Sequence, residues 1–187
     1  MNRSGTNVWK PSRLEIAAAH GMKVRDVIAP RLQILFCGIN PGLYSGAVGH
    51  HFARPGNRFW PALYAAGFTD HLLSPFEERE LLKLRLGITN IADRSTAGAA
   101  ELTVEELRSG AQRLKRKIRK FRPRWVAFLG ITAYRIAFDR KKAVLGQQEG
   151  RLGTAGVWIL PNPSGLNAHF QLAQLAGAFR DLRRAIS

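Results

Sequence analysis

The stretch Leu32–Gly38 (LQILFCG) is a predominantly apolar run that ends in glycine and is too short for a helix. Three further runs have the same character: Leu86–Ile91 (LGITNI), Arg124–Gly130 (RWVAFLG) and Gly156–Pro161 (GVWILP). Strands that are apolar on both faces are typical of a parallel sheet covered by helices. These segments therefore predict the buried strands of one mainly parallel sheet.

Segments with helical periodicity alternate with these predicted strands. They are Asn57–Ala66, Pro75–Arg85, Thr103–Phe121 and Phe170–Ile186. Thr103 followed by Glu106 forms a capping-box pattern, which favours a helix start at that point. Alternation of strands and helices with crossovers of this length predicts a three-layer α/β/α sandwich with a short, mainly parallel central sheet.

The length of the chain indicates the number of domains, and its charge indicates the kind of partner. A chain of 187 residues fits one domain of ordinary size. We expect a basic, loosely ordered N-terminal arm with one short helix over residues 1–26 and a single domain over 27–187. Lys and Arg number 29 against 13 Asp and Glu, a formal net charge of +16. Such an excess favours a polyanionic partner, most commonly nucleic acid.

The cysteine content and the hydropathy exclude several other classes of protein. The single cysteine, Cys37, excludes a disulfide framework, an iron–sulfur cluster and a four-thiolate zinc site. We predict neither a metal site nor a cofactor. No apolar run approaches the roughly 18 residues of a membrane span, so we expect no membrane association. The expected location is the cytoplasm, of bacterial type and close to the nucleoid.

Two loops rich in glycine and proline follow predicted strands. Gly38–Gly42 (GINPG) follows the first strand, and Pro161–Asn167 (PNPSGLN) follows the last. Ligands of parallel α/β sheets bind at the carboxyl ends of the strands, where both loops are expected to lie. Each loop alone could be an ordinary turn, since Asn-Pro and Ser-Gly are common loop pairs. Their joint placement at one sheet edge favours a shared functional site.

Together with His51–Trp60 (HFARPGNRFW), these loops resemble the mismatch-specific uracil-DNA glycosylases, the family that includes thymine-DNA glycosylase. The three segments occur in the family's order and spacing, and the resemblance extends from about Asp26 to the C-terminus. It implies a uracil-DNA glycosylase-like fold and a DNA repair enzyme of base excision repair. The expected substrate is double-stranded DNA with a mismatched or damaged base, chiefly uracil in a G·U pair and related damaged pyrimidines. The enzyme would flip the base out and hydrolyse its N-glycosidic bond.

Two residues are candidates for catalysis. By the resemblance, Asn40 positions the water that attacks the sugar C1′. An amide orients water through its carbonyl oxygen but takes no proton at neutral pH, so slow turnover is expected. Asp93, which follows the strand Leu86–Ile91, is our own hypothesis for a general base or for stabilising positive charge on the sugar. The equally favoured alternative is a loop aspartate that pairs with Arg94 or caps the backbone.

The resemblance also implies a pocket for the flipped base. Phe52 would stack on the base, and Ile39 and Tyr44 would line the pocket. We assign Gly42 and Asn57 to the same pocket. No lysine lies in either loop, so a lyase step through an amine nucleophile is not expected, and the predicted activity is monofunctional.

Leu166 is the candidate for the wedge that fills the vacated base stack, because it is an apolar residue at the tip of a Gly-flanked loop. Ser164 and the N–H groups around Gly165 would bind a phosphate, and Asn167 could reach the orphaned guanine. Some family members have Ser-Arg after the wedge where this chain has Asn167-Ala168. Asn162 completes the DNA-binding loop, and Arg54 and Arg58 are candidates for specific phosphate contacts.

The sequence also allows other interpretations of its basic residues and of its function. The segment Arg108–Arg124 contains nine Lys or Arg and no acid. It is either a solvated helix face or, as we prefer, a diffuse electrostatic contribution to phosphate binding. A non-catalytic DNA-binding module for damaged or flipped bases would share the charge, the wedge and the aromatic plate. A nucleotide-handling enzyme is disfavoured, because neither a Walker-type nor a G-x-G-x-x-G motif is present. Monomeric action is expected, since a lesion imposes no symmetry.

Overall fold

A five-stranded sheet with the strand order β2-β1-β3-β5-β4 forms the centre of the protein. The computed structural model describes residues 10–167 and 169–186. The strands are β1 (Ile34–Gly38), β2 (Leu86–Asn90), β3 (Trp125–Leu129), β4 (Gly146–Leu152) and β5 (Ala155–Leu160). The first four in spatial order are parallel, whereas β4 pairs with β5 in antiparallel fashion. The predicted parallel strands are confirmed. The pattern analysis did not detect β4, because an edge strand with exposed polar residues lacks an apolar run.

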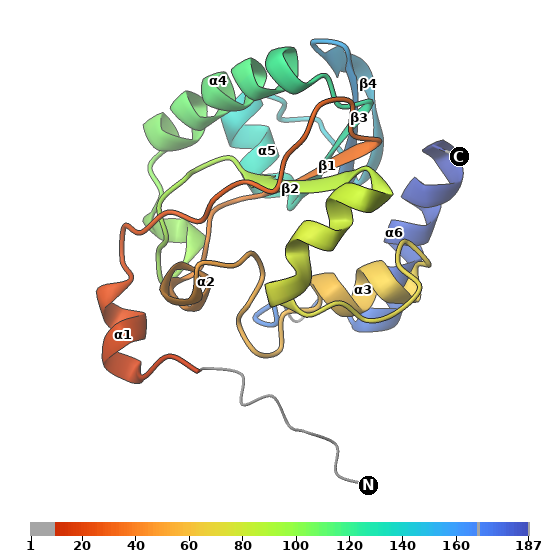
Figure 1. Cartoon of the computed structure of the whole chain (residues 1–187). Helices are drawn as coiled ribbons and strands as arrows, with labels where there is room; N and C mark the ends of the chain where they lie inside the picture. Colours follow the sequence, from red (N-terminus) through yellow and green to blue (C-terminus); the bar gives the residue numbers. More distant parts are fainter. Residues whose placement is uncertain (1–9, 168, 187) are drawn as a thin grey trace, which may run out of the picture.

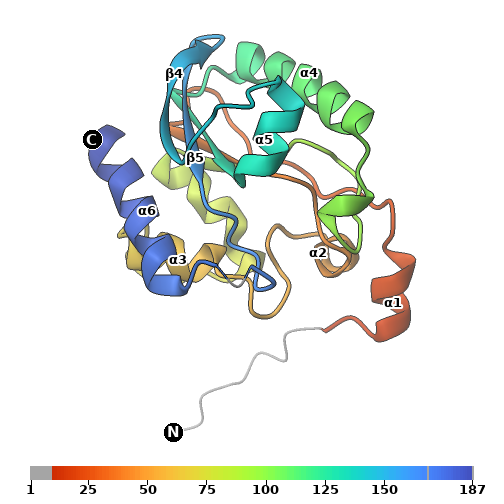
Figure 2. The same cartoon turned by 180° about the vertical axis from the view of Figure 1, so that it is seen from behind.

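Helices cover both faces of the sheet (Figures 1 and 2). Their bounds are α1 (Arg13–Ala18), α2 (Leu43–Val48), α3 (Phe59–Ala65), α4 (Val104–Phe121), α5 (Ile131–Phe138) and α6 (Leu172–Ile186), with 3₁₀ segments η1 (Pro75–Leu84) and η2 (Ala99–Glu101). Side chains of α3, η1 and α6 pack in one core cluster, and those of α4 and α5 in a second. The predicted three-layer α/β/α fold is therefore confirmed.

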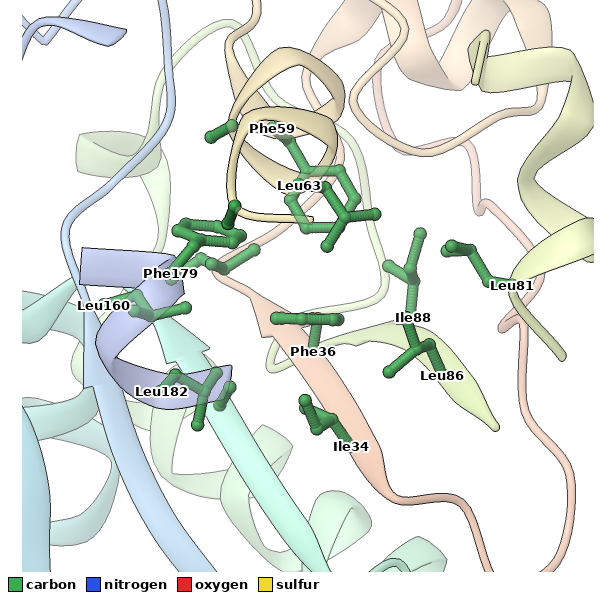
Figure 3. Packing of buried hydrophobic residues seen from close by; sticks show 14 of the residues in the cluster. Ile34, Phe36, Phe59, Leu63, Leu81, Leu86, Ile88, Leu160, Phe179 and Leu182 are labelled. Carbon is green, nitrogen blue, oxygen red and sulfur yellow. The ribbon is translucent and has the colours of Figure 1, made fainter. Parts of the chain in front are cut away.

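Alternation along β1 divides its side chains between the two clusters. Ile34 and Phe36 belong to the first cluster, and Leu35 and Cys37 to the second. The ring of Phe36 lies 5.5 Å from that of Phe59 and 5.8 Å from that of Phe179, between α3 and α6 (Figure 3). Burial on both faces fixes the register of β1. It thereby fixes the position of the Gly38–Gly42 turn that follows this strand.

The helix α4 begins as its sequence predicts. The hydroxyl of Thr103 accepts a hydrogen bond from the Glu106 N–H at 3.1 Å, and the Glu106 carboxylate accepts one from the Thr103 N–H at 2.8 Å. These reciprocal bonds satisfy backbone donors that would otherwise lack partners. The apolar residues Leu107, Ala111, Leu114 and Ile118 of this helix pack inward, and its basic residues face outward or lie at the edges of the buried face.

Residues 10–26, which we expected to belong to a loosely ordered arm, are packed on the domain. They carry α1, and Ala19 behind this helix is fully buried. The Ser95 hydroxyl donates to the Ala19 carbonyl, and the Gly21 N–H donates to the Ser95 carbonyl at 2.9 Å. These buried hydrogen bonds hold residues 10–26 on the domain, and the hydropathy pattern of this polar, basic segment did not indicate them. Residues 1–9 of the expected arm lie outside the described residues. Across the ranges that the structure describes, no helix has the length and hydropathy to cross a membrane.

Candidate active site

A cavity of about 340 Å³ opens at the carboxyl ends of β1, β2 and β5. The loop after β1 and the loop after β5 both line it, so Asn40 and Leu166 share one cleft as the sequence analysis requires. The Leu166 side chain is 70% exposed at the tip of its loop. The predicted site residues that line the cavity are Ile39, Asn40, Gly42, Phe52, Arg54, Asn57, Asn162, Ser164, Leu166 and Asn167.

The side-chain amide of Asn40 is held in one orientation. Its Nδ2 group lies 3.0 Å from the Pro41 carbonyl, 3.1 Å from the Arg94 carbonyl and 2.7 Å from the Thr96 hydroxyl oxygen. Because a carbonyl can only accept, the nitrogen must face these groups. No described residue donates a hydrogen bond to Oδ1 of Asn40. This oxygen is therefore an acceptor that the cleft offers to a water molecule.

Phe52 supplies an aromatic wall of the cavity. Its ring stacks on Phe59 at a centroid distance of 4.2 Å and an interplanar angle of 28°. The Phe52 backbone has a φ of +54°, a left-handed conformation that is uncommon for a bulky residue. Such strain persists only where the surroundings enforce it, and it is frequent at functional sites. The half-buried ring, backed by Phe59, has the support that a stacking surface for a base requires.

Asn90 and His51 also line the cavity, and the sequence analysis assigned a role to neither. The His51 Nε2 atom lies 2.9 Å from the Arg25 carbonyl, which only accepts, so Nε2 carries the proton and Nδ1 is an acceptor in the neutral ring. Burial lowers the pKa of His51 and so favours this neutral form. The Asn90 Nδ2 group faces Nδ1 at 3.4 Å.

The orientation of Asn90 that follows places its Oδ1 toward the cavity. This oxygen lies beside Gly38, where a Cβ would approach it to 2.4 Å, so a larger residue at position 38 would displace the Asn90 amide. Asn90 is 5% exposed, and no described residue donates a hydrogen bond to its Oδ1. A polar residue at the end of an apolar strand was the available signal for Asn90, since it stands last in β2.

The structure does not bring Asp93 to the cavity. Its carboxylate lies 3.2 Å from Nε of Arg113 and 3.8 Å from Nζ of Lys117, both on α4. The expected pairing with Arg94 is also not seen, because Arg94 binds Glu106 instead. Asp93 therefore fits the structural alternative, with α4 as its partner. The chain turns after β2 so that the backbone carbonyl of Arg94, and not the Asp93 side chain, meets Asn40.

Two further assignments need correction. Tyr44 does not line the cavity, because α2 begins directly after Gly42 and contributes Ser45 instead. Arg58 is not free for phosphate: its guanidinium donates to the carbonyls of Ser164, Asn167 and Phe170. Gly165 is not among the residues that line the cavity, and a Cβ at this position would approach the Gly56 carbonyl to 2.6 Å. The phosphate contact expected of the N–H groups around Gly165 stays a prediction.

In the loop Pro161–Asn167, hereafter the Leu166 loop, the side-chain amides of two asparagines make hydrogen bonds to the backbone. The Asn162 Oδ1 accepts from the Ser164 N–H at 2.9 Å. The Asn167 Nδ2 donates to the Asn162 carbonyl at 2.9 Å, and its Oδ1 accepts from the His169 N–H at 3.2 Å. Asn167 therefore shapes the loop, and reading a guanine would require it to break these bonds. Together with Arg58, these contacts hold Leu166 outward.

The fold and the cleft define an α/β protein with its binding site at the carboxyl edge of the sheet. The comparisons with known proteins identify its family: residues 25–183 match the profile of the uracil DNA glycosylase superfamily, and the chain belongs to this superfamily. A similar fold occurs in the solution NMR structure of a Methanosarcina acetivorans protein, provisionally assigned as a uracil DNA glycosylase. That structure shares 20% identity, covers 87% of this chain and 98% of its own, and gives a TM-score of 0.57. Membership of the superfamily supports a DNA glycosylase activity.

Proposed function

We propose that the protein is a monofunctional DNA glycosylase that removes uracil from G·U mismatches in duplex DNA, together with related damaged pyrimidines. The observation that carries the proposal is the single cleft in which the free Oδ1 of Asn40 and the exposed Leu166 occur together. In this proposal the protein acts as a monomer, in a cytoplasm of bacterial type.

The cleft contains a candidate for each step of base flipping. Leu166 enters the base stack when the nucleotide leaves it, and so offsets part of the cost of unstacking. The flipped base stacks on Phe52, and Oδ1 of Asn90 accepts a hydrogen bond from the N3–H group of uracil. Cytosine has no N3–H and would face this oxygen with a lone pair. The orientation of Asn90 thus favours uracil over cytosine.

The chemistry of the cleft fits a slow hydrolysis. None of the described residues that line the cavity is Asp, Glu or Lys. Asn40 can orient a water toward C1′ through Oδ1, but it cannot take the proton of that water. The barrier is therefore lowered mainly by departure of the uracil anion and formation of an oxocarbenium-like sugar. Without a lysine amine at the site, the product is an abasic site and an intact strand.

A non-catalytic module that binds flipped bases is the second candidate, because Phe52 and Leu166 would serve it equally well. End-labelled duplexes carrying G·U, A·U or G·T pairs, incubated with the protein and then treated with alkali, separate the two. The enzyme predicts alkali-dependent scission at the uracil of the G·U duplex. Binding of that duplex without scission would establish the module. Scission without alkali would contradict the monofunctional mechanism.

A further inference from the structure

A row of exposed arginines lies at the amino edge of the sheet, at the opposite ends of the strands from the cavity. Arg85 directly precedes β2, Arg124 directly precedes β3, and Arg31 lies in the segment that leads into β1. Arg151 of β4 pairs in register with Gly156, which pairs with Trp125 at the start of β3. With neighbouring strands about 4.8 Å apart, the row extends roughly 19 Å. These residues and Arg122 are called the amino-edge arginines.

Three of these arginines occupy backbone positions that favour glycine. The φ angles are +57° at Arg31, +58° at Arg85 and +50° at Arg122. The turns are held by backbone hydrogen bonds, for example from the Arg31 N–H to the Phe121 carbonyl at 2.7 Å. A side chain at a left-handed position costs free energy, and residues kept there are frequent at functional sites. The same charged side chain occurs at all three turns.

The amino-edge arginines have no acidic partner among the described residues. Arg85 donates to the Arg31 carbonyl and Arg151 to the Thr154 carbonyl, so these two guanidiniums also support the turns. The side chains of Arg31, Arg122 and Arg124 make no hydrogen bond or ion pair within the described ranges. Glu80, close by in η1, pairs with Lys83. The edge is therefore a positively charged surface on which none of these arginines forms an ion pair with a described residue.

A duplex bound at the cavity does not neutralise this surface. The parallel strands have five or six residues, so the two sheet edges are about 17 Å apart. Charges further apart than the Debye length of about 8 Å at physiological salt are largely screened from each other. In both Figures 1 and 2 the C-terminal end of α4 lies beside β4, away from α1 and α2. A phosphate held at the cavity is therefore largely screened from the amino-edge arginines.

We propose that the amino-edge arginines form a second DNA-binding surface, which takes the phosphate backbone of a duplex segment other than the one at the cavity. Planar guanidinium groups match phosphate oxygens in charge and geometry. DNA is favoured over an acidic protein because the chain carries a net charge of +16 and belongs to a superfamily of DNA glycosylases. The proposal rests on the proposed function only in the choice of duplex DNA as the polyanion.

The test counts the DNA duplexes that one protein molecule binds. The edge variant combines Arg31→Gly, Arg122→Gly and Arg124→Gln; glycine suits the two left-handed positions, so folding should be preserved. The control variant combines Arg140→Gln, Lys141→Gln and Lys142→Gln, exposed residues outside the segment Arg108–Arg124 whose loss changes the charge equally. Each protein is titrated at low salt with a fluorescent duplex of about one helical turn, and the stoichiometry is measured by sedimentation.

Wild type and the control variant should bind two duplexes, and the edge variant one. If the edge variant still binds a second duplex, its affinity for that duplex should be at least about tenfold lower than that of the wild type. The slope of log affinity against log salt concentration should then be smaller by about 2.7, the value for three lost phosphate contacts. One duplex on wild type, or two on the edge variant at unchanged affinity, would overturn the proposal. So would equal losses in both variants. Polyglutamate binding that requires the edge residues, with no second duplex on wild type, would assign the surface to an acidic protein instead.

Uracil excision from the same short duplex separates this proposal from the proposed function. The edge variant should excise uracil at the wild-type rate, since the cavity is unchanged. If wild type excises nothing yet binds two duplexes, the proposed function fails and the second surface stands. If the edge variant loses excision together with the second duplex, the two surfaces are not separate and the proposal is wrong.

Discussion

Replacing Arg58 with lysine should separate a structural role for this residue from the phosphate contact that the sequence suggested. The guanidinium donates hydrogen bonds to three carbonyls, those of Ser164 and Asn167 in the Leu166 loop and that of Phe170 after it. The Arg58 backbone N–H donates to the Pro163 carbonyl at 3.0 Å. Arg58→Lys keeps the charge and the backbone contact. A lysine ammonium lacks the planar fork that serves several carbonyls at once.

The expected loss follows from the number of hydrogen bonds. A hydrogen bond from a charged donor contributes about 1.5–3 kcal/mol, and the half-buried position calls for the lower end of that range. Losing two of the three bonds, with some compensation by water, should cost the closed loop about 2 kcal/mol. A difference of about 1.4 kcal/mol is tenfold in a rate, so the excision rate should fall roughly thirtyfold. The cost is local, and the melting temperature should change little.

Single-turnover excision from a G·U duplex at several salt concentrations measures this effect. Arg54→Gln is the matched comparison, because Arg54 is exposed, lines the cavity and remains a candidate for a phosphate contact. Arg54→Gln should reduce the salt slope of binding by about 0.9, whereas Arg58→Lys should leave the slope unchanged. A wild-type rate for Arg58→Lys would refute the reasoning. A lower slope for that variant would also refute it.

Three further predictions follow from the described contacts. Leu166→Ala should lower excision from duplex DNA by about tenfold or more, because unstacking costs a few kcal/mol, while thermal unfolding stays unchanged; a lower melting temperature would indicate a packing role instead. Asp93→Asn should lower the melting temperature, because it removes the carboxylate that pairs with Arg113 and Lys117, and should leave the single-turnover rate unchanged; a hundredfold slower reaction would restore Asp93 to catalysis. Burial lowers the pKa of His51 below the ordinary value of 6.5. The neutral His51 therefore contributes its full stabilisation above about pH 6.5, and this contribution is lost as the pH falls toward the lower pKa of the folded state. Denaturant unfolding should show a pH slope of up to about 1.4 kcal/mol per pH unit in that window, smaller in His51→Gln, and an equal slope in both proteins would contradict the assignment.

The sequence predicts the fold because each buried strand is recognisable from the apolar residues of its own short segment. The parallel strands are almost entirely buried on both faces and are mostly apolar, as expected for strands between two helical layers. The strand β4 has exposed polar residues, and α2 has six residues without an apolar stripe. Such elements are stabilised by their neighbours, and periodicity does not detect them.

The part of the site that lies in the two loops was predictable from the sequence. Asn40 and Leu166 stand in loops whose glycines and prolines mark them, and parallel topology brings these loops to one edge. The direction of a side chain is set by partners distant in sequence, which no local pattern contains. Asp93 therefore faces α4, and Arg58 binds carbonyls more than a hundred positions away. The amino-edge arginines likewise become neighbours only through the strand order.

The most direct test of the central claim compares wild type and Asn40→Ala in single-turnover excision of uracil from a G·U duplex. If Oδ1 of Asn40 positions the attacking water, the variant should bind the duplex but react at least about a hundredfold more slowly, the loss typical of a positioned catalytic group. Excision by Asn40→Ala within a few-fold of the wild-type rate would contradict the account.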